Sequence, residues 1–141
     1  MGYIKKALHT GISVKNMEES VKWYAENLEF DVVSKDMGFV PPLGAKIVFV
    51  KNEALDYEIE LFEYQDPKPL PEDRLTPNTD LQTIGTKHLA LEIDGFDELH
   101  DKLVKNGVDI AHEVKMDGDA VMFIRDCNGV LIELIQPPKA E

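Results

Sequence analysis

The chain has 141 residues, of which 43% are hydrophobic, and this is enough material for one compact unit with an apolar core. Its formal net charge of −12 argues against nucleic acid or an anionic membrane surface as a partner. No apolar run approaches the roughly 20 residues of a membrane span, and the start of the sequence lacks the pattern of a secretory signal. Because Cys127 is the only cysteine, no intrachain disulfide can form, and we expect a cytoplasmic protein.

The first half of the chain predicts a strand, a helix and three more strands. Residues 8–14 alternate in polarity, with Ile12 on one face of the expected strand and His9 on the other. Asn16 is a typical helix N-cap residue, and the apolar stripe that follows it ends at Leu28. Further strands are expected at 30–34, 45–51 and 57–64, and an irregular loop is expected at 36–44.

A proline-rich segment separates this half from a second half with the same order of elements. Residues 65–84 hold four of the eight prolines and predict a surface linker. His88 lies in the next expected strand, Asp94 is the expected helix cap, and Gly107 ends the helix. The last strands are expected at 109–115, 120–125 and 130–135, with a hairpin turn at Asn128-Gly129. Because neither half alone can cover both faces of its sheet, the two halves are expected to pack together.

The two halves repeat one histidine and one glutamate in the same order. Glu60 lies 51 residues after His9, and Glu133 lies 45 residues after His88. Side-chain alternation puts all four groups on the strand face that points away from the helix. Each residue alone would be ordinary, but the repetition favours metal ligands, and two imidazoles with two carboxylates suit Zn, Ni, Co, Mn or Fe(II). The other histidines, expected at the surface because they have no counterpart, are His100 and His112.

The chain resembles the vicinal oxygen chelate superfamily, which includes glyoxalase I, methylmalonyl-CoA epimerase, extradiol dioxygenases and bleomycin or fosfomycin resistance proteins. The resemblance spans about residues 6–137. The stretches that carry it are 9–14, 23–28, 87–93 and 123–134. It implies an α+β fold of two tandem βαβββ modules whose sheets form an open, barrel-like cleft around the metal. The implied organisation is a single domain over 1–141, with module 1 at about 6–64, the linker at 65–84 and module 2 at about 85–137.

Bacterial glyoxalase I-like enzymes often bind their metal through His, Glu, His and Glu, and His9, Glu60, His88 and Glu133 match that order. The resemblance therefore implies a metal-dependent lyase or isomerase that moves a proton next to a carbonyl of a small-molecule substrate through a metal-stabilised enediolate. Glu133 or Glu60 would be the base, and the resemblance favours Glu133. The alternatives are a methylmalonyl-CoA epimerase-like racemase, an extradiol-type dioxygenase and a non-catalytic ligand-binding or resistance protein. A homodimer is expected, with the metal site formed within one chain or shared by two.

Overall fold

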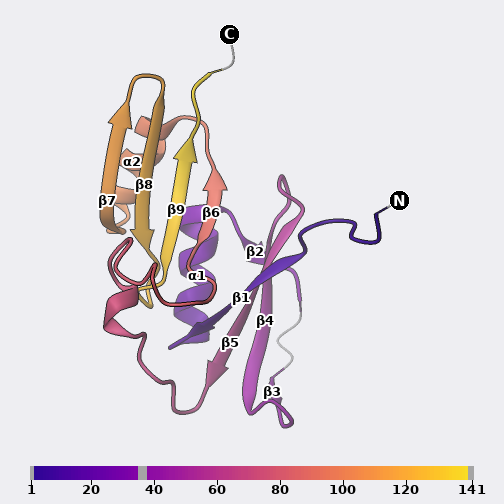
Figure 1. Ribbon diagram of the computed structural model, residues 1–141. Coiled ribbons are helices and arrows are strands. Elements are labelled where there is room, and N and C mark those ends of the chain that lie inside the picture. Colours follow the sequence, from indigo (N-terminus) through magenta and orange to yellow (C-terminus); the bar gives the residue numbers. More distant parts are fainter. Residues whose placement is uncertain (1, 35–37, 140–141) are drawn as a thin grey trace. The chain divides into compact units, whose positions relative to one another are not determined.

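The computed structural model describes residues 2–34 and 38–139, and the chain divides into two compact units, Met1–Lys68 and Pro69–Glu141. Each unit combines a helix with a β-sheet, so the predicted α+β class is confirmed (Figure 1). The second unit begins at Pro69, so it includes most of the segment expected to be a linker. No helix in the described ranges is long and apolar enough to span a bilayer.

Unit 1 follows the predicted order of strand, helix and further strands. Its elements are β1 (His9–Val14), α1 (Met17–Leu28), β2 (Asp31–Val32), β3 (Phe39–Val40), β4 (Ala45–Asn52) and β5 (Tyr57–Tyr64). β1 pairs in parallel with β5, β5 pairs antiparallel with β4, and β4 also pairs with β2 and β3. The expectation of an irregular loop at 36–44 is wrong at β3, because pairing with β4 satisfies the backbone of Phe39 and Val40; residues 35–37 lie outside the described ranges.

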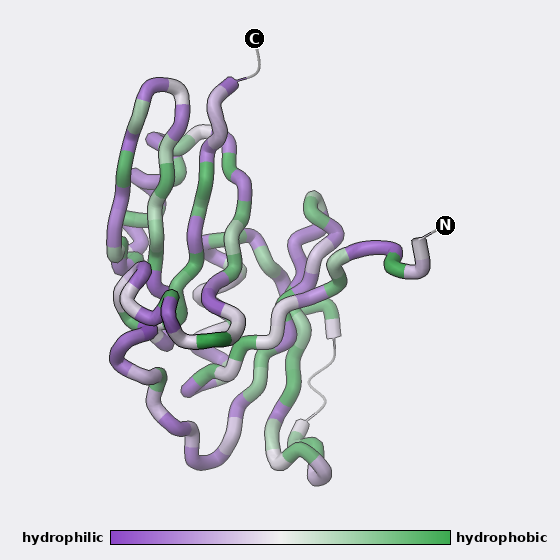
Figure 2. The backbone as a smooth tube through the Cα atoms, in the orientation of Figure 1, coloured by the Kyte–Doolittle hydropathy of each residue, from purple (hydrophilic) through white to green (hydrophobic). Residues whose placement is uncertain are grey.

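Helix α1 covers one face of the unit 1 sheet. It begins as predicted, because the Asn16 side chain accepts a hydrogen bond of 2.9 Å from the backbone N–H of Glu19. Its buried face includes Tyr24 and Leu28, and the strands that it contacts contribute buried residues such as Val50 and Ile59. Figure 2 shows hydrophobic and hydrophilic residues interleaved along the strands, as expected when one sheet face is buried and the other is more open.

Unit 2 repeats this architecture. Its elements are η1 (Glu72–Arg74), β6 (Leu89–Glu92), α2 (Phe96–Lys105), β7 (Asp109–Met116), β8 (Asp119–Arg125) and β9 (Leu131–Gln136). The sheet order is β6-β9-β8-β7, and β6 is parallel to β9. The predicted cap Asp94 is wrong by one residue: Gly95 occupies the cap position with a φ of 73°, a conformation that favours glycine, and the Asp94 side chain accepts from the Gly95 N–H at 3.0 Å.

A strand side chain secures the first turn of the helix in each unit. The Glu63 carboxylate accepts from the backbone N–H of Met17, and the Gln136 side-chain oxygen accepts from that of Phe96 at 2.8 Å. Glu63 lies three residues after Glu60, and Gln136 lies three residues after the other repeated glutamate. Because strand side chains alternate, an odd spacing puts the cap on the helix side of the sheet and the repeated glutamate on the opposite side.

Replacing either capping side chain by alanine is expected to destabilise the fold. Glu63→Ala and Gln136→Ala each leave a helix N–H without its side-chain acceptor, which costs about 1 kcal/mol. The free energy of unfolding, measured in urea, is the quantity to compare. Glu58→Ala is the matched control, because Glu58 lies on the same strand as Glu63 but on the opposite face. An equal loss in the Glu58 variant would contradict the capping role.

Candidate metal centre

His9 and Glu60 lie together on the sheet face of unit 1 that α1 leaves uncovered. The β1–β5 register pairs Gly11 with Glu60, so His9, two residues earlier, is diagonally offset from Glu60 on the same face. Nε2 of His9 is 3.7 Å from Oε1 of Glu60, and the two side chains are 33% and 20% exposed. We call this face of each sheet the histidine face. In unit 1 its residues include His9, Phe49, Lys51, Glu58, Glu60 and Phe62.

His88 and Glu133 form the equivalent pair in unit 2. The β6–β9 register pairs Ala90 with Glu133, and His88 again stands two residues before the paired position. Nε2 of His88 is 3.5 Å from Oε1 of Glu133, and the side chains are 24% and 20% exposed. The histidine face of unit 2 includes His88, Glu133, Phe123 and Arg125. Two stretches of different sequence therefore arrive at the same offset, spacing and partial burial.

An aromatic ring stands beside each pair. Phe49 contacts the imidazole of His9 edge-to-face, with ring centroids 5.7 Å apart and an interplanar angle of 79°. Phe123 contacts His88 in the same way, at 5.1 Å and 78°. Phe49 is in register with Glu60, and Phe123 is in register with the equivalent glutamate of unit 2. Each unit thus carries the same trio of histidine, glutamate and phenylalanine.

The spacing within each pair suits two ligands of one metal ion. The N···O distances of 3.7 and 3.5 Å exceed the usual 2.7–3.2 Å of an N–H···O hydrogen bond. Two donor atoms that each lie about 2.1 Å from an ion, at a tetrahedral angle, are roughly 3.4 Å apart. Within either unit, the described residues hold no group of three or more His, Cys, Asp or Glu side chains that could bind a metal. Each unit therefore contains one pair of candidate donor atoms.

The remaining histidines have different surroundings. Nε2 of His100, on α2, lies 2.6 Å from a carboxylate oxygen of Glu113 on β7, and the imidazole stacks on Phe96. His100 is therefore half-buried rather than at the surface, since it contacts both Phe96 and Glu113. His112 is exposed, as expected. Neither histidine takes part in a repeated pair.

A charge cluster at the β4–β5 turn binds Lys51 on the histidine face of unit 1. The Lys51 ammonium is 3.0 Å from the Asp56 carboxylate; this hydrogen bond, followed by the charge of Glu53, raises the pKa of Lys51. Lys6 donates to the same carboxylate at 2.7 Å, and the hydrogen bonds from Lys6 and then Lys51 lower the pKa of Asp56. The positive charge of Lys51 is therefore balanced at the turn.

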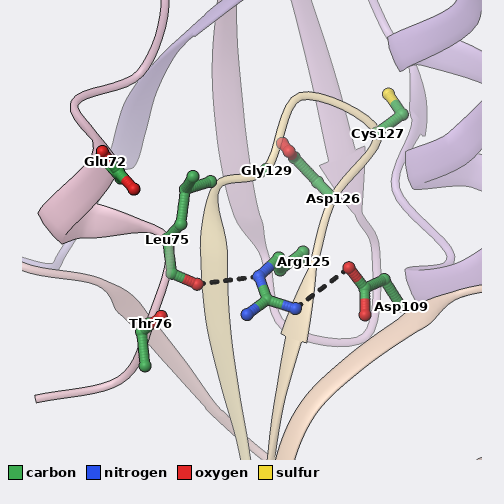
Figure 3. Close-up of a pocket in the computed structure, with 8 residues that line it drawn as sticks. All are labelled: Glu72, Leu75, Thr76, Asp109, Arg125, Asp126, Cys127 and Gly129. Atoms are coloured by element: carbon green, nitrogen blue, oxygen red, sulfur yellow. Dashed lines mark hydrogen bonds and ion pairs between the residues drawn. The ribbon is translucent and has the colours of Figure 1, made fainter.

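A pocket of about 570 Å³ opens in unit 2 around Arg125 (Figure 3). Its lining residues are Glu72, Leu75, Thr76, Asp109, Arg125, Asp126, Cys127 and Gly129. The Arg125 guanidinium donates through Nε to the Leu75 carbonyl at 2.7 Å and through Nη1 to Asp109 at 3.0 Å. The predicted linker thus forms one wall of a pocket, and this pocket was not predicted from the sequence. The one sequence feature that pointed to it is Arg125, because the chain has only two arginines.

Gly129 is required where the linker meets the β8–β9 turn. Its φ is 92°, and an added Cβ would lie 2.8 Å from a methyl group of Leu75. Gly129→Ala is expected to lower the free energy of unfolding by about 1–3 kcal/mol because of the strained backbone, with Leu75 displaced in addition. Gly107→Ala is the control in urea unfolding, because Gly107 has a φ of 75° with nothing near its Cβ position. Equal losses in both variants would show that the contact with Leu75 contributes nothing.

Solved structures with a similar fold include a glyoxalase family protein from Enterococcus faecalis, with 22% identity, coverage of 96% of this chain and 100% of that chain, and a TM-score of 0.76. TnmS3, an antibiotic binding protein from Streptomyces sp. CB03234, has 18% identity, coverage of 97% and 99%, and a TM-score of 0.69. The trypanothione-dependent glyoxalase I of Leishmania major has 25% identity, coverage of 94% and 87%, and a TM-score of 0.71.

Among curated proteins, none matches this chain. The family model of the Glyoxalase/Bleomycin resistance protein/Dioxygenase superfamily matches residues 6–134, which is nearly the whole sequence. The resemblance to the vicinal oxygen chelate proteins is therefore confirmed at the level of the superfamily. The chain belongs to the Glyoxalase/Bleomycin resistance protein/Dioxygenase superfamily.

Proposed function

We propose that this protein is a metal-dependent lyase or isomerase of the glyoxalase I-like type, which moves a proton next to a carbonyl of a small-molecule substrate. The observation that carries the proposal is the duplicated His–Glu pair, with N···O distances of 3.7 and 3.5 Å in the two units. The 25% identity to a glyoxalase I over 94% of this chain also supports it.

His9, Glu60, His88 and Glu133 are the proposed ligands of one divalent ion. Imidazole and carboxylate donors fit Zn, Ni, Co, Mn or Fe(II), whereas Mg and Ca avoid imidazole. Bringing two carboxylates together without a cation would cost repulsion or force one of them to bind a proton. A divalent ion bound between the two carboxylates would remove that conflict.

Glu133 is the proposed base. When bound, a divalent ion supplies a Lewis acid for a substrate oxygen. The Glu133 carboxylate removes the proton from the carbon next to the carbonyl and returns it to the neighbouring carbon, which completes the proton shift. Its same-face neighbours on β9 are the apolar residues Leu131 and Ile135. Glu60, by contrast, has the charged Glu58 as one same-face neighbour on β5 and Phe62 as the other.

Elemental analysis of the purified protein, followed by activity assays, tests this proposal. The expected result is a stoichiometric divalent metal and turnover of a hemithioacetal or an acyl-CoA thioester that chelation abolishes. Consumption of oxygen with catechols would instead indicate a ring-cleaving dioxygenase. Failure to bind any divalent ion, even when supplied in excess, would contradict the metal site and leave ligand binding without chemistry.

A further inference from the structure

We infer that Phe49 and Phe123 are positioning residues, which hold the imidazoles of His9 and His88 in the orientation that binds metal. This inference rests on the proposed function and extends it to two residues that contact neither ion nor substrate.

A histidine that binds a metal through one ring nitrogen usually donates its other N–H to a carboxylate, a carbonyl or a water molecule, and this fixes the ring. In the described part of the chain, neither His9 nor His88 donates such a hydrogen bond to a protein group. Both side chains are also partly exposed, at 33% and 24%. A contact with a neighbouring protein side chain would limit rotation of these rings about the side-chain bonds.

Phe49 and Phe123 lie where their rings can contact the two imidazoles. β5 lies between β1 and β4 in the unit 1 sheet, and Phe49 on β4 is in register with Glu60 on β5. The His9 and Phe49 rings meet edge-to-face, which means that they approach each other across the strand that carries Glu60. An imidazole that leans toward Phe49 therefore also leans toward the Glu60 carboxylate.

The same geometry in unit 2 argues against incidental packing. β9 lies between β6 and β8, and Phe123 on β8 is in register with Glu133 on β9. Its ring meets that of His88 with an interplanar angle of 78°, against 79° in unit 1. Edge-to-face contacts of this kind favour one relative orientation of the two rings. The duplication has thus kept the ring contact together with the ligand pair.

Phe62 provides a matched control. It lies on the same histidine face as Phe49, two residues beyond Glu60 on β5, and both side chains are half-buried. Its ring is the nearest neighbour of Gly11, and among the described side chains it forms no ring contact with His9. Removing Phe62 therefore removes similar apolar surface from the same face without the contact that we consider important.

Titration of the metal-free protein with Co(II), followed by visible absorption and by competition with a chelator, tests the inference. Phe49→Leu is expected to weaken Co(II) binding by about three- to tenfold, the value of one aromatic contact, and to change the ligand-field spectrum. Phe49→Tyr keeps the ring and should restore both properties. Phe62→Leu should match the wild type.

In NMR spectra of the metal-free protein, the ring-current shift of the His9 protons should disappear in Phe49→Leu only.

The outcomes separate the two proposals. Wild-type protein that binds no Co(II) would overturn the proposed function and this inference together. If the wild type binds Co(II), two results would overturn the inference alone. One is an unchanged affinity and spectrum in Phe49→Leu, and the other is an equal effect in Phe62→Leu. Phe123→Leu is the second variant, expected to act in the same direction. Because Phe123 is only 7% exposed, its variant needs a thermal unfolding measurement beside the titration, whereas Phe49→Leu carries the decision.

Discussion

Glu133→Gln is expected to lower kcat by about 100- to 10,000-fold while the protein still binds its metal. The amide oxygen of glutamine can remain a ligand, but it cannot take up a proton, so the variant separates ligation from base catalysis. Metal content by elemental analysis and turnover under saturating substrate are the two measurements. The resemblance favours Glu133 as the base, and its same-face neighbours Leu131 and Ile135 on the histidine face of unit 2 are apolar.

Glu60→Gln is the matched control for this prediction, because it makes the same chemical change at the equivalent position of unit 1. Its side chain has the same exposure, 20%, and a similar distance to its histidine. We expect a much smaller loss of kcat in Glu60→Gln than in Glu133→Gln. Normal turnover by metal-loaded Glu133→Gln would refute the assignment, and a severe loss in Glu60→Gln alone would transfer the role of base to Glu60.

Removal of either repeated histidine is expected to weaken metal binding by at least about 100-fold, because loss of a direct ligand should exceed the 10- to 100-fold effect of losing a partner behind it. His9→Ala and His88→Ala should behave alike, since the two pairs have the same geometry. His112→Ala is the control, as His112 is exposed and belongs to no repeated pair. Metal affinity is measured by competition with a chelator. A loss of affinity in only one of the two histidine variants would contradict the shared site.

Mixing these two variants distinguishes a site within one chain from a site shared by two chains of a homodimer. If the site lies within one chain, a mixture of His9→Ala and His88→Ala protein contains no complete ligand set. If unit 1 of one chain joins unit 2 of another, each mixed dimer regains one intact site, because its two wild-type units meet. Recovery of metal binding after unfolding and refolding the two variants together would therefore indicate the shared arrangement.

The features that could be predicted from the sequence are those determined by neighbours along the chain. Asn16 caps α1 because its side chain reaches the N–H of Glu19, three residues away. Alternation along β1 and β5 is enough to put His9 and Glu60 on one face, because side chains of a strand point to opposite sides in turn. The repetition of this pattern then identified both pairs without any knowledge of the fold.

The features that were missed depend on pairing partners that the local sequence pattern does not identify. Phe39–Val40 forms a strand only because β4 pairs with it, so its proline- and glycine-rich surroundings indicated a loop. The backbone N–H of Phe96 at the start of α2 donates to the side chain of Gln136, 40 residues further along, and Gly95 rather than Asp94 occupies the cap position. Likewise, the contact between Phe49 and His9 follows from the register of β4, which local periodicity does not determine.

The presence of a complete donor pair in each unit has a consequence for the origin of such a protein. In each unit, a segment of fewer than 70 residues contains the donor pair, the aromatic ring and the tie that secures the helix. Under the proposed four-ligand site, a peptide of half this length would already provide every donor by associating with an identical copy of itself. Joining two such peptides end to end would then free each copy to diverge, so that one specialises in catalysis and the other in ligation.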